Sequence, residues 1–99
     1  MAELDSRMQG KVSYFLADVI QLVGGRLKKA VARPANAKAG ADPMADVEVL
    51  LVLDDLPTRD MYRIWNLAGE AGVKYDVALS VHAYSVKAVS YTHLTLPTN

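Results

Sequence analysis

Two carboxylates separated by one apolar residue open the most apolar segment of this sequence. Asp46 and Glu48 stand in the pattern Asp-Val-Glu-Val, and only leucine and valine follow as far as position 53. If the segment is a strand, its period of two places both side chains on one face, with Cβ atoms roughly 6 to 7 Å apart. Carboxylates at that spacing can converge on a hard divalent cation such as Mg²⁺.

A third carboxylate, Asp76, holds the equivalent early position in the next β-rich segment of the chain. If the two segments are neighbouring strands, three acids meet at one edge and repel one another unless a cation joins them. The alternative interpretation is that each acid only marks where a strand leaves solvent. The spacing alone leaves both interpretations open.

The segments that would position these acids alternate between helical and extended patterns. Apolar residues recur at helical spacing from Val12 to Val23, and Gly24-Gly25 follows as a stop signal. Leu27 to Ala32 is a weak candidate strand, and residues 33–45, rich in Ala, Pro, Gly and Asn, read as a loop.

The second half of the sequence predicts a strand, a helix and a strand. Val47 to Leu53 reads as a buried central strand. A helix follows with Thr58 as N-cap, ending near Gly72, and Tyr75 to Val81 reads as a third strand. Trp65 and Tyr62 are expected in the core. The predicted fold class is α/β (α+β), a small mixed sheet with helices packed on it.

Composition excludes several classes of protein. Eleven basic residues balance eleven acidic ones, so no general attraction to nucleic acid or membrane is expected. There is no cysteine, which excludes disulfides and thiolate metal sites. No apolar run approaches the length of a membrane span, and the acidic N-terminus does not resemble a signal peptide. A cytoplasmic, soluble protein is expected.

From Leu27 to Ser85 the chain resembles the minimal nucleotidyltransferases of the DNA polymerase beta-like superfamily. The resemblance rests on Asp46-Val47-Glu48-Val49, the following LLVLDD, and YDVALS, which matches the family's third acidic strand. It implies that Asp46, Glu48 and Asp76 bind Mg²⁺ or Mn²⁺ and catalyse transfer of a nucleoside monophosphate from an NTP, ATP foremost, to an acceptor hydroxyl. It also implies a possible HEPN-type helical partner in a toxin–antitoxin pair.

The chain departs from the family in the turn that binds nucleotide phosphates. Pro34-Ala35 replace the expected Gly-Ser, and Lys38 stands where the family carries arginine. Pro34 has no N–H and Ala35 has no hydroxyl to offer a phosphate. The alternative function is therefore a catalytically inactive nucleotidyltransferase-fold protein that works by binding its partner. A third interpretation is that the acids have no function. His82 is interpreted as a surface or packing residue.

The C-terminal segment spells a sequencing adapter. Val89 to Thr98 read VSYTHLTLPT, the translation of a common transposase adapter with its primer site; adapter bases also complete the codon of Ala88 and supply the first base of the Asn99 codon. We therefore expect residues 89–99 to be an artefactual tail. Residues 1–88 would be an incomplete nucleotidyltransferase-like domain, a truncated metagenomic fragment that is genuine to about Lys87.

Overall fold

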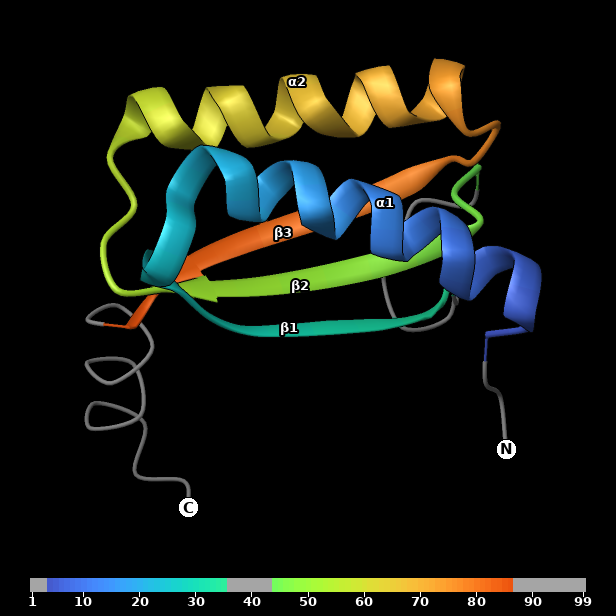
Figure 1. Cartoon of the computed structure of the whole chain (residues 1–99), viewed down its shortest axis with the longest axis horizontal. Helices are drawn as coiled ribbons and strands as arrows, with labels where there is room; N and C mark the ends of the chain where they lie inside the picture. The colour runs from blue at the N-terminus through green and yellow to red at the C-terminus, as the bar shows by residue number, and fades with distance from the viewer. Residues whose placement is uncertain (1–3, 36–43, 87–99) are drawn as a thin grey trace.

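The protein is a two-layer structure in which both helices lie on the same side of a small sheet (Figure 1). The computed structural model describes residues 4–35 and 44–86. Their elements in chain order are α1 (Ser6–Val23), the short 3₁₀ helix η1 (Gly24–Arg26), β1 (Leu27–Pro34), β2 (Val47–Leu53), α2 (Thr58–Lys74) and β3 (Leu79–Ser85). The mixed α/β fold class predicted from the sequence is confirmed.

The sheet has the strand order β1-β2-β3, with β1 antiparallel and β3 parallel to the central strand. A parallel neighbour requires a crossover connection, and α2 supplies it. The predicted strand–helix–strand unit is therefore confirmed, and the bounds predicted for β2 are those observed.

The core lies between the helices and one face of the sheet. Alternate residues of β2 face the helices and are completely buried: Val47, Val49, Leu51 and Leu53. They pack with Phe15 and Val19 of α1 and Ile64 of α2. Burying each large side chain contributes roughly 1.5 to 3 kcal/mol, so this layer is the main source of stability. No helix in the described ranges is long and apolar enough to cross a membrane.

The first helix is longer than the sequence pattern predicts. It begins at Ser6, because the Asp5 side chain caps it by accepting a 2.9 Å hydrogen bond from the Met8 N–H. It ends at Val23, and Gly24 follows at φ 61°, a conformation that favours glycine. The predicted glycine stop is confirmed.

One prediction about the second helix is wrong. Its N-cap is Pro57, with no side-chain capping bond, so Thr58 is the first helical residue and not the cap. The helix ends at Lys74, two residues past Gly72 and close to the predicted end.

The two aromatic residues expected in the core are exposed, by 46% for Trp65 and 59% for Tyr62. The buried stripe of α2 runs through Asp60, Ile64 and Ala71, and each residue step turns the helix by about 100°. Trp65 therefore points away from the stripe, and its ring packs edge-on against that of Tyr62, with centroids 5.6 Å apart.

Both outer strands differ from their predicted bounds. β1 continues to Pro34, so Arg33 belongs to a strand and not to the predicted loop, and proline is tolerated there because β1 is an edge strand. β3 begins at Leu79, four residues later than predicted. Asp76 precedes it at φ 55°, a left-handed conformation that aspartate tolerates but a strand does not contain.

Candidate functional site

The predicted site acids lie around the beginning of β2. Asp46 is an exposed residue directly before the strand, and its Oδ2 accepts a 3.0 Å hydrogen bond from the Ala78 N–H. The Asp46 N–H also donates to the Ala78 carbonyl at 2.7 Å. Asp46 thus joins the start of β2 to the residue before β3, and one carboxylate oxygen is already in use.

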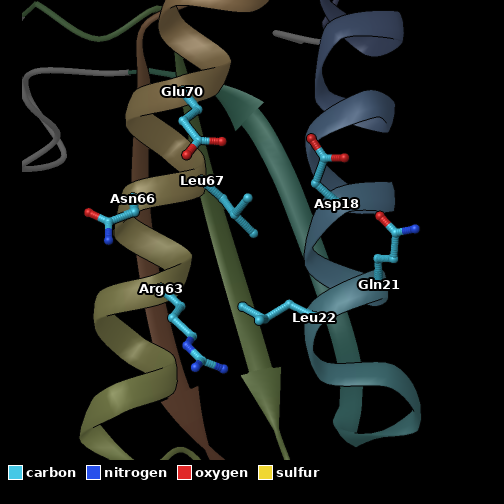
Figure 2. A pocket seen from close by; sticks show the side chains of 7 residues that line it. All are labelled: Asp18, Gln21, Leu22, Arg63, Asn66, Leu67 and Glu70. Carbon is cyan, nitrogen blue, oxygen red and sulfur yellow. The ribbon is translucent and has the colours of Figure 1, made fainter.

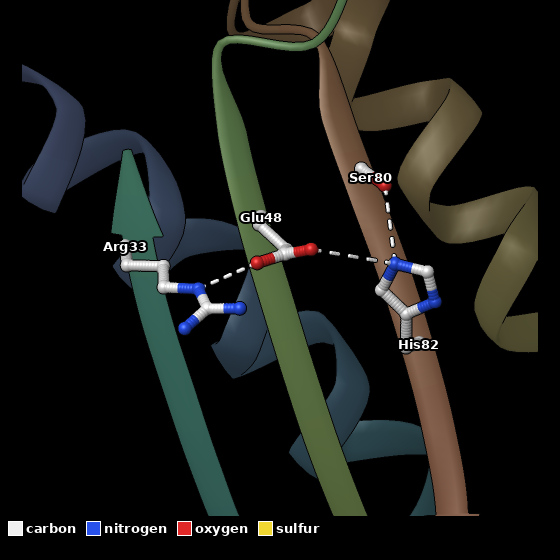
Figure 3. Close-up of polar contacts among 4 residues, drawn as sticks. All are labelled: Arg33, Glu48, Ser80 and His82. Atoms are coloured by element: carbon white, nitrogen blue, oxygen red, sulfur yellow. Dashed lines mark hydrogen bonds and ion pairs between the residues drawn. The ribbon is translucent and has the colours of Figure 1, made fainter. Parts of the chain in front are cut away.

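Glu48 is buried, with 6% exposure, although it lies on the sheet face opposite the two helices of the described residues. Its Oε1 accepts a 2.5 Å charge-assisted hydrogen bond from Arg33 Nε on β1 (Figure 3). The two residues are direct partners in the antiparallel register, which explains the contact. A guanidinium therefore neutralises the carboxylate that was predicted to bind metal.

His82 and Ser80 complete this polar cluster from β3. His82 Nε2 lies 3.7 Å from Glu48 Oε2 and 3.4 Å from Ser80 Oγ (Figure 3). A serine–histidine–acid triad needs one ring nitrogen for the serine and the other for the acid. Here both contacts use the same nitrogen, so the arrangement cannot activate Ser80 as a nucleophile. His82 is a half-buried member of the cluster, as a packing residue would be.

The remaining predicted site residues lie in different places. Pro34 pairs with Val47, and the Ala35 N–H donates to the Asp46 carbonyl at 3.2 Å, so the structure brings the predicted phosphate turn beside the first acid. Asp76 instead lies in the connection before β3, where its carbonyl accepts a 2.9 Å hydrogen bond from Lys11 Nζ. Lys38 lies outside the described residues.

The three predicted acids are not gathered into one cluster in the observed arrangement. Within the two described ranges, no group of three or more histidine, aspartate or glutamate side chains could hold a metal ion. The geometry gives the reason, since one oxygen of Asp46 holds a backbone N–H and Glu48 holds Arg33. The predicted roles of Asp46, Glu48 and Asp76 in binding metal and in catalysis stay predictions.

Sequence reasoning missed Arg33 as a functional neighbour of Glu48. It was assigned to a loop because residues 33–45 are rich in Ala, Pro, Gly and Asn and show no sustained period. The signal that could have found it is alternation along β1, where Lys29, Val31 and Arg33 share one face once the strand is extended.

A second feature is a groove in the helical layer, between α1 and α2 (Figure 2). Leu22 and Leu67 point toward each other across its floor, and its rim is polar. The rim consists of Asp18, Gln21, Arg63, Asn66 and Glu70. An apolar floor with amide and charged groups at its edges suits a peptide or helix better than a metal ion.

Comparison with known protein families, curated proteins and solved structures gives no match for this chain. Function is therefore argued from the geometry of the acids and from the residue pattern that surrounds them.

Proposed function

We propose that this chain is a cytoplasmic, nucleotidyltransferase-like domain that acts by binding a protein partner and not by transferring nucleotides. The observation that carries the proposal is the ion pair between Glu48 and Arg33. A buried carboxylate bound to a guanidinium is already neutralised, so a cation would have to displace Arg33 before it could bind.

Two further observations support the loss of catalysis. The Asp46 carboxylate accepts the Ala78 N–H, a contact that helps to place β3 beside β2. The turn that would hold nucleotide phosphates begins with Pro34, which has no N–H to donate, and the Ala35 N–H is bound to the Asp46 carbonyl. One oxygen of the Asp46 carboxylate and the Ala35 N–H, two groups that would bind the metal and the nucleotide phosphates, are therefore already hydrogen-bonded within the fold.

The groove between α1 and α2 is the observation that favours a protein partner. A helix from a HEPN-type protein, the partner implied by the family resemblance, would place apolar side chains against Leu22 and Leu67. The rim carries both charge signs and two amides, which can pair with a polar helix flank. We expect the partner helix to bind in this groove.

Thermal unfolding of the full chain with ATP and Mg²⁺ or Mn²⁺ tests the loss of catalysis. Ligands that bind only the folded state raise the melting temperature, so we expect no metal-dependent shift with ATP. The Arg33→Ala variant frees Glu48, and it should bind Mn²⁺ more tightly than the wild type in calorimetry. A metal-dependent shift of the wild type with ATP would contradict the proposal.

Size-exclusion co-elution with a purified HEPN-type helical protein tests the binding role. Leu67→Asp places a charge on the groove floor and should abolish co-elution. Val73→Asp is the matched control, because Val73 is 87% exposed on the same helix outside the groove. Equal loss in both variants, or none in either, would contradict the assignment of the groove.

The second candidate is an active nucleotidyltransferase, favoured by the placement of Asp46 and Glu48 two residues apart at the start of β2. Its test is transfer of radiolabelled AMP from ATP to the same helical protein. Transfer that disappears in Asp46→Asn would establish this candidate and exclude the binding-only function. Absence of transfer at all metal concentrations would exclude the enzyme.

A further inference from the structure

We infer that the sheet face opposite the helices binds single-stranded nucleic acid. This open face consists of three rows of side chains from the three strands, and it is separate from the helical groove. The inference does not rest on the proposed function. It rests on the side chains that the strand register places there.

The register defines the open face. Glu48 pairs with Arg33 and with Ser80, and all three side chains lie on the face away from the helices (Figure 3). Because side chains alternate along a strand, every second residue shares that face. Its nine members are Lys29, Val31 and Arg33 of β1, Glu48, Leu50 and Val52 of β2, and Ser80, His82 and Tyr84 of β3.

The exposed charge of this face has one sign. Lys29 is exposed and the Arg33 side chain is 53% exposed, both on β1. The one carboxylate of the nine residues is Glu48, which is buried and neutralised by Arg33. The chain has no net charge and Glu48 offsets the charge of Arg33, so this cationic row would attract phosphates through Lys29, while the Nη groups of Arg33 would add hydrogen bonds to them.

Aromatic rings lie along the opposite edge of the same face. Tyr84 is 45% exposed, and the His82 side chain is 41% exposed. They are two residues apart on β3, which places their Cα atoms roughly 6 to 7 Å apart. Bases stack on such rings, and this stacking tolerates any base because each has a π-face.

The distance between the two rows fits one nucleic acid strand. β1 and β3 are separated by β2, so the cationic and aromatic rows lie about 10 Å apart. The long side chains of Lys29 and Arg33 can reach phosphates while bases stack over Tyr84 and His82. Leu50 and Val52 lie between the rows and are half-buried, so bases that stack on the rings can also contact them.

Fluorescence anisotropy with labelled uridine and thymidine decamers tests this inference on the full chain. Removing a stacking ring costs about 1 to 3 kcal/mol, so Tyr84→Ala should weaken binding about 5- to 150-fold. Tyr84→Phe should keep most of the affinity because the ring remains. Tyr62→Ala is the matched control, since Tyr62 is an exposed tyrosine on α2 and its removal should leave the affinity for the decamers unchanged.

Salt dependence tests the cationic row. Lys29→Gln should reduce the slope of log affinity against log salt by roughly 0.7, the value for one phosphate contact in a single strand. Lys74→Gln, at the end of α2, should leave the slope unchanged. Amide NMR shifts upon adding uridine decamer should fall on the three strands, and this readout serves if Tyr84→Ala does not fold.

Three results would overturn the inference. One is the absence of binding at low salt. The second is an equal loss of affinity in Tyr84→Ala and Tyr62→Ala. The third is binding of an acidic amphipathic peptide to the same strands with no competition from either decamer, which would make the open face a protein-binding surface.

Discussion

The central strand β2 has two faces with opposite roles. The residues that face the helices, such as Val49 and Leu51, are completely buried and apolar. On the open face the same strand carries Glu48, which is bound to Arg33, followed by half-buried Leu50 and Val52. One periodic segment therefore supplies stability on one side and polar chemistry on the other, because side chains alternate with a period of two.

Substitutions on the two faces of the sheet should therefore have different effects. A change on the covered face should act through the free energy of unfolding alone. A change on the open face should cost less stability, and it should alter the charge or the contacts available to a ligand.

The largest difference is expected between neighbouring leucines on β2. Leu51→Ala leaves a cavity in the core and should lower the free energy of unfolding by about 2 to 5 kcal/mol. Leu50→Ala should cost roughly 1 kcal/mol, because that side chain is only partly buried. Urea denaturation monitored by circular dichroism measures both. Similar costs for the two variants would mean that the open face is covered in solution.

The next largest effect concerns the ion pair on the open face. Arg33→Ala leaves Glu48 buried beside His82 alone, and it should destabilise the fold by about 1 to 3 kcal/mol, limited by the solvent exposure of Arg33. Glu48→Gln removes the charge that needs a partner. The double variant should therefore be more stable than the sum of the single variants predicts, in a double-mutant cycle measured by urea unfolding. Simple additivity would show that the two side chains are uncoupled.

Much of the covered face could be predicted from the sequence. The bounds of β2 follow from an unbroken run of valine and leucine between acids, and the parallel arrangement of β2 and β3 follows from the helix that connects them. Gly24 marks the end of α1 because glycine adopts positive φ without strain. These features depend on local composition and period, which a single sequence contains.

The open face could not be predicted in the same way. The contact between Arg33 and Glu48 depends on the register across a connection of low periodicity, which sequence spacing does not determine. The start of β3 was placed too early because Tyr75 and Val77 are β-formers, whereas the backbone turns at Asp76. Trp65 was expected in the core because it recurs at helical spacing with other apolar residues, but the buried stripe of α2 is narrower and runs through Asp60, Ile64 and Ala71.

A smaller effect is expected at the junction between the two strands. Asp46→Ala removes the hydrogen bond to the Ala78 N–H and should cost about 0.5 to 1.5 kcal/mol, with faster hydrogen exchange of that amide. Asp46→Asn keeps an acceptor oxygen and should behave like the wild type. Asp55→Ala, at an exposed residue after β2, is the control and should change stability by less than about 0.5 kcal/mol. Unchanged exchange at Ala78 in Asp46→Ala would show that the Asp46 carboxylate does not hold the Ala78 N–H.

The smallest effect should come from a second ion pair of β1, which joins Lys28 to Asp54 just after the end of β2. Lys28 Nζ lies 3.2 Å from Asp54 Oδ2, and both side chains are about half exposed, so Lys28→Ala should cost between about 0 and 1 kcal/mol. Salt screens exposed charges more than buried ones. In double-mutant cycles at low and high salt, the coupling of Lys28 with Asp54 should therefore vanish while that of Arg33 with Glu48 persists. If both couplings vanish together, Glu48 is as accessible to solvent as Asp54, and the barrier to metal binding that we assign to Arg33 does not exist.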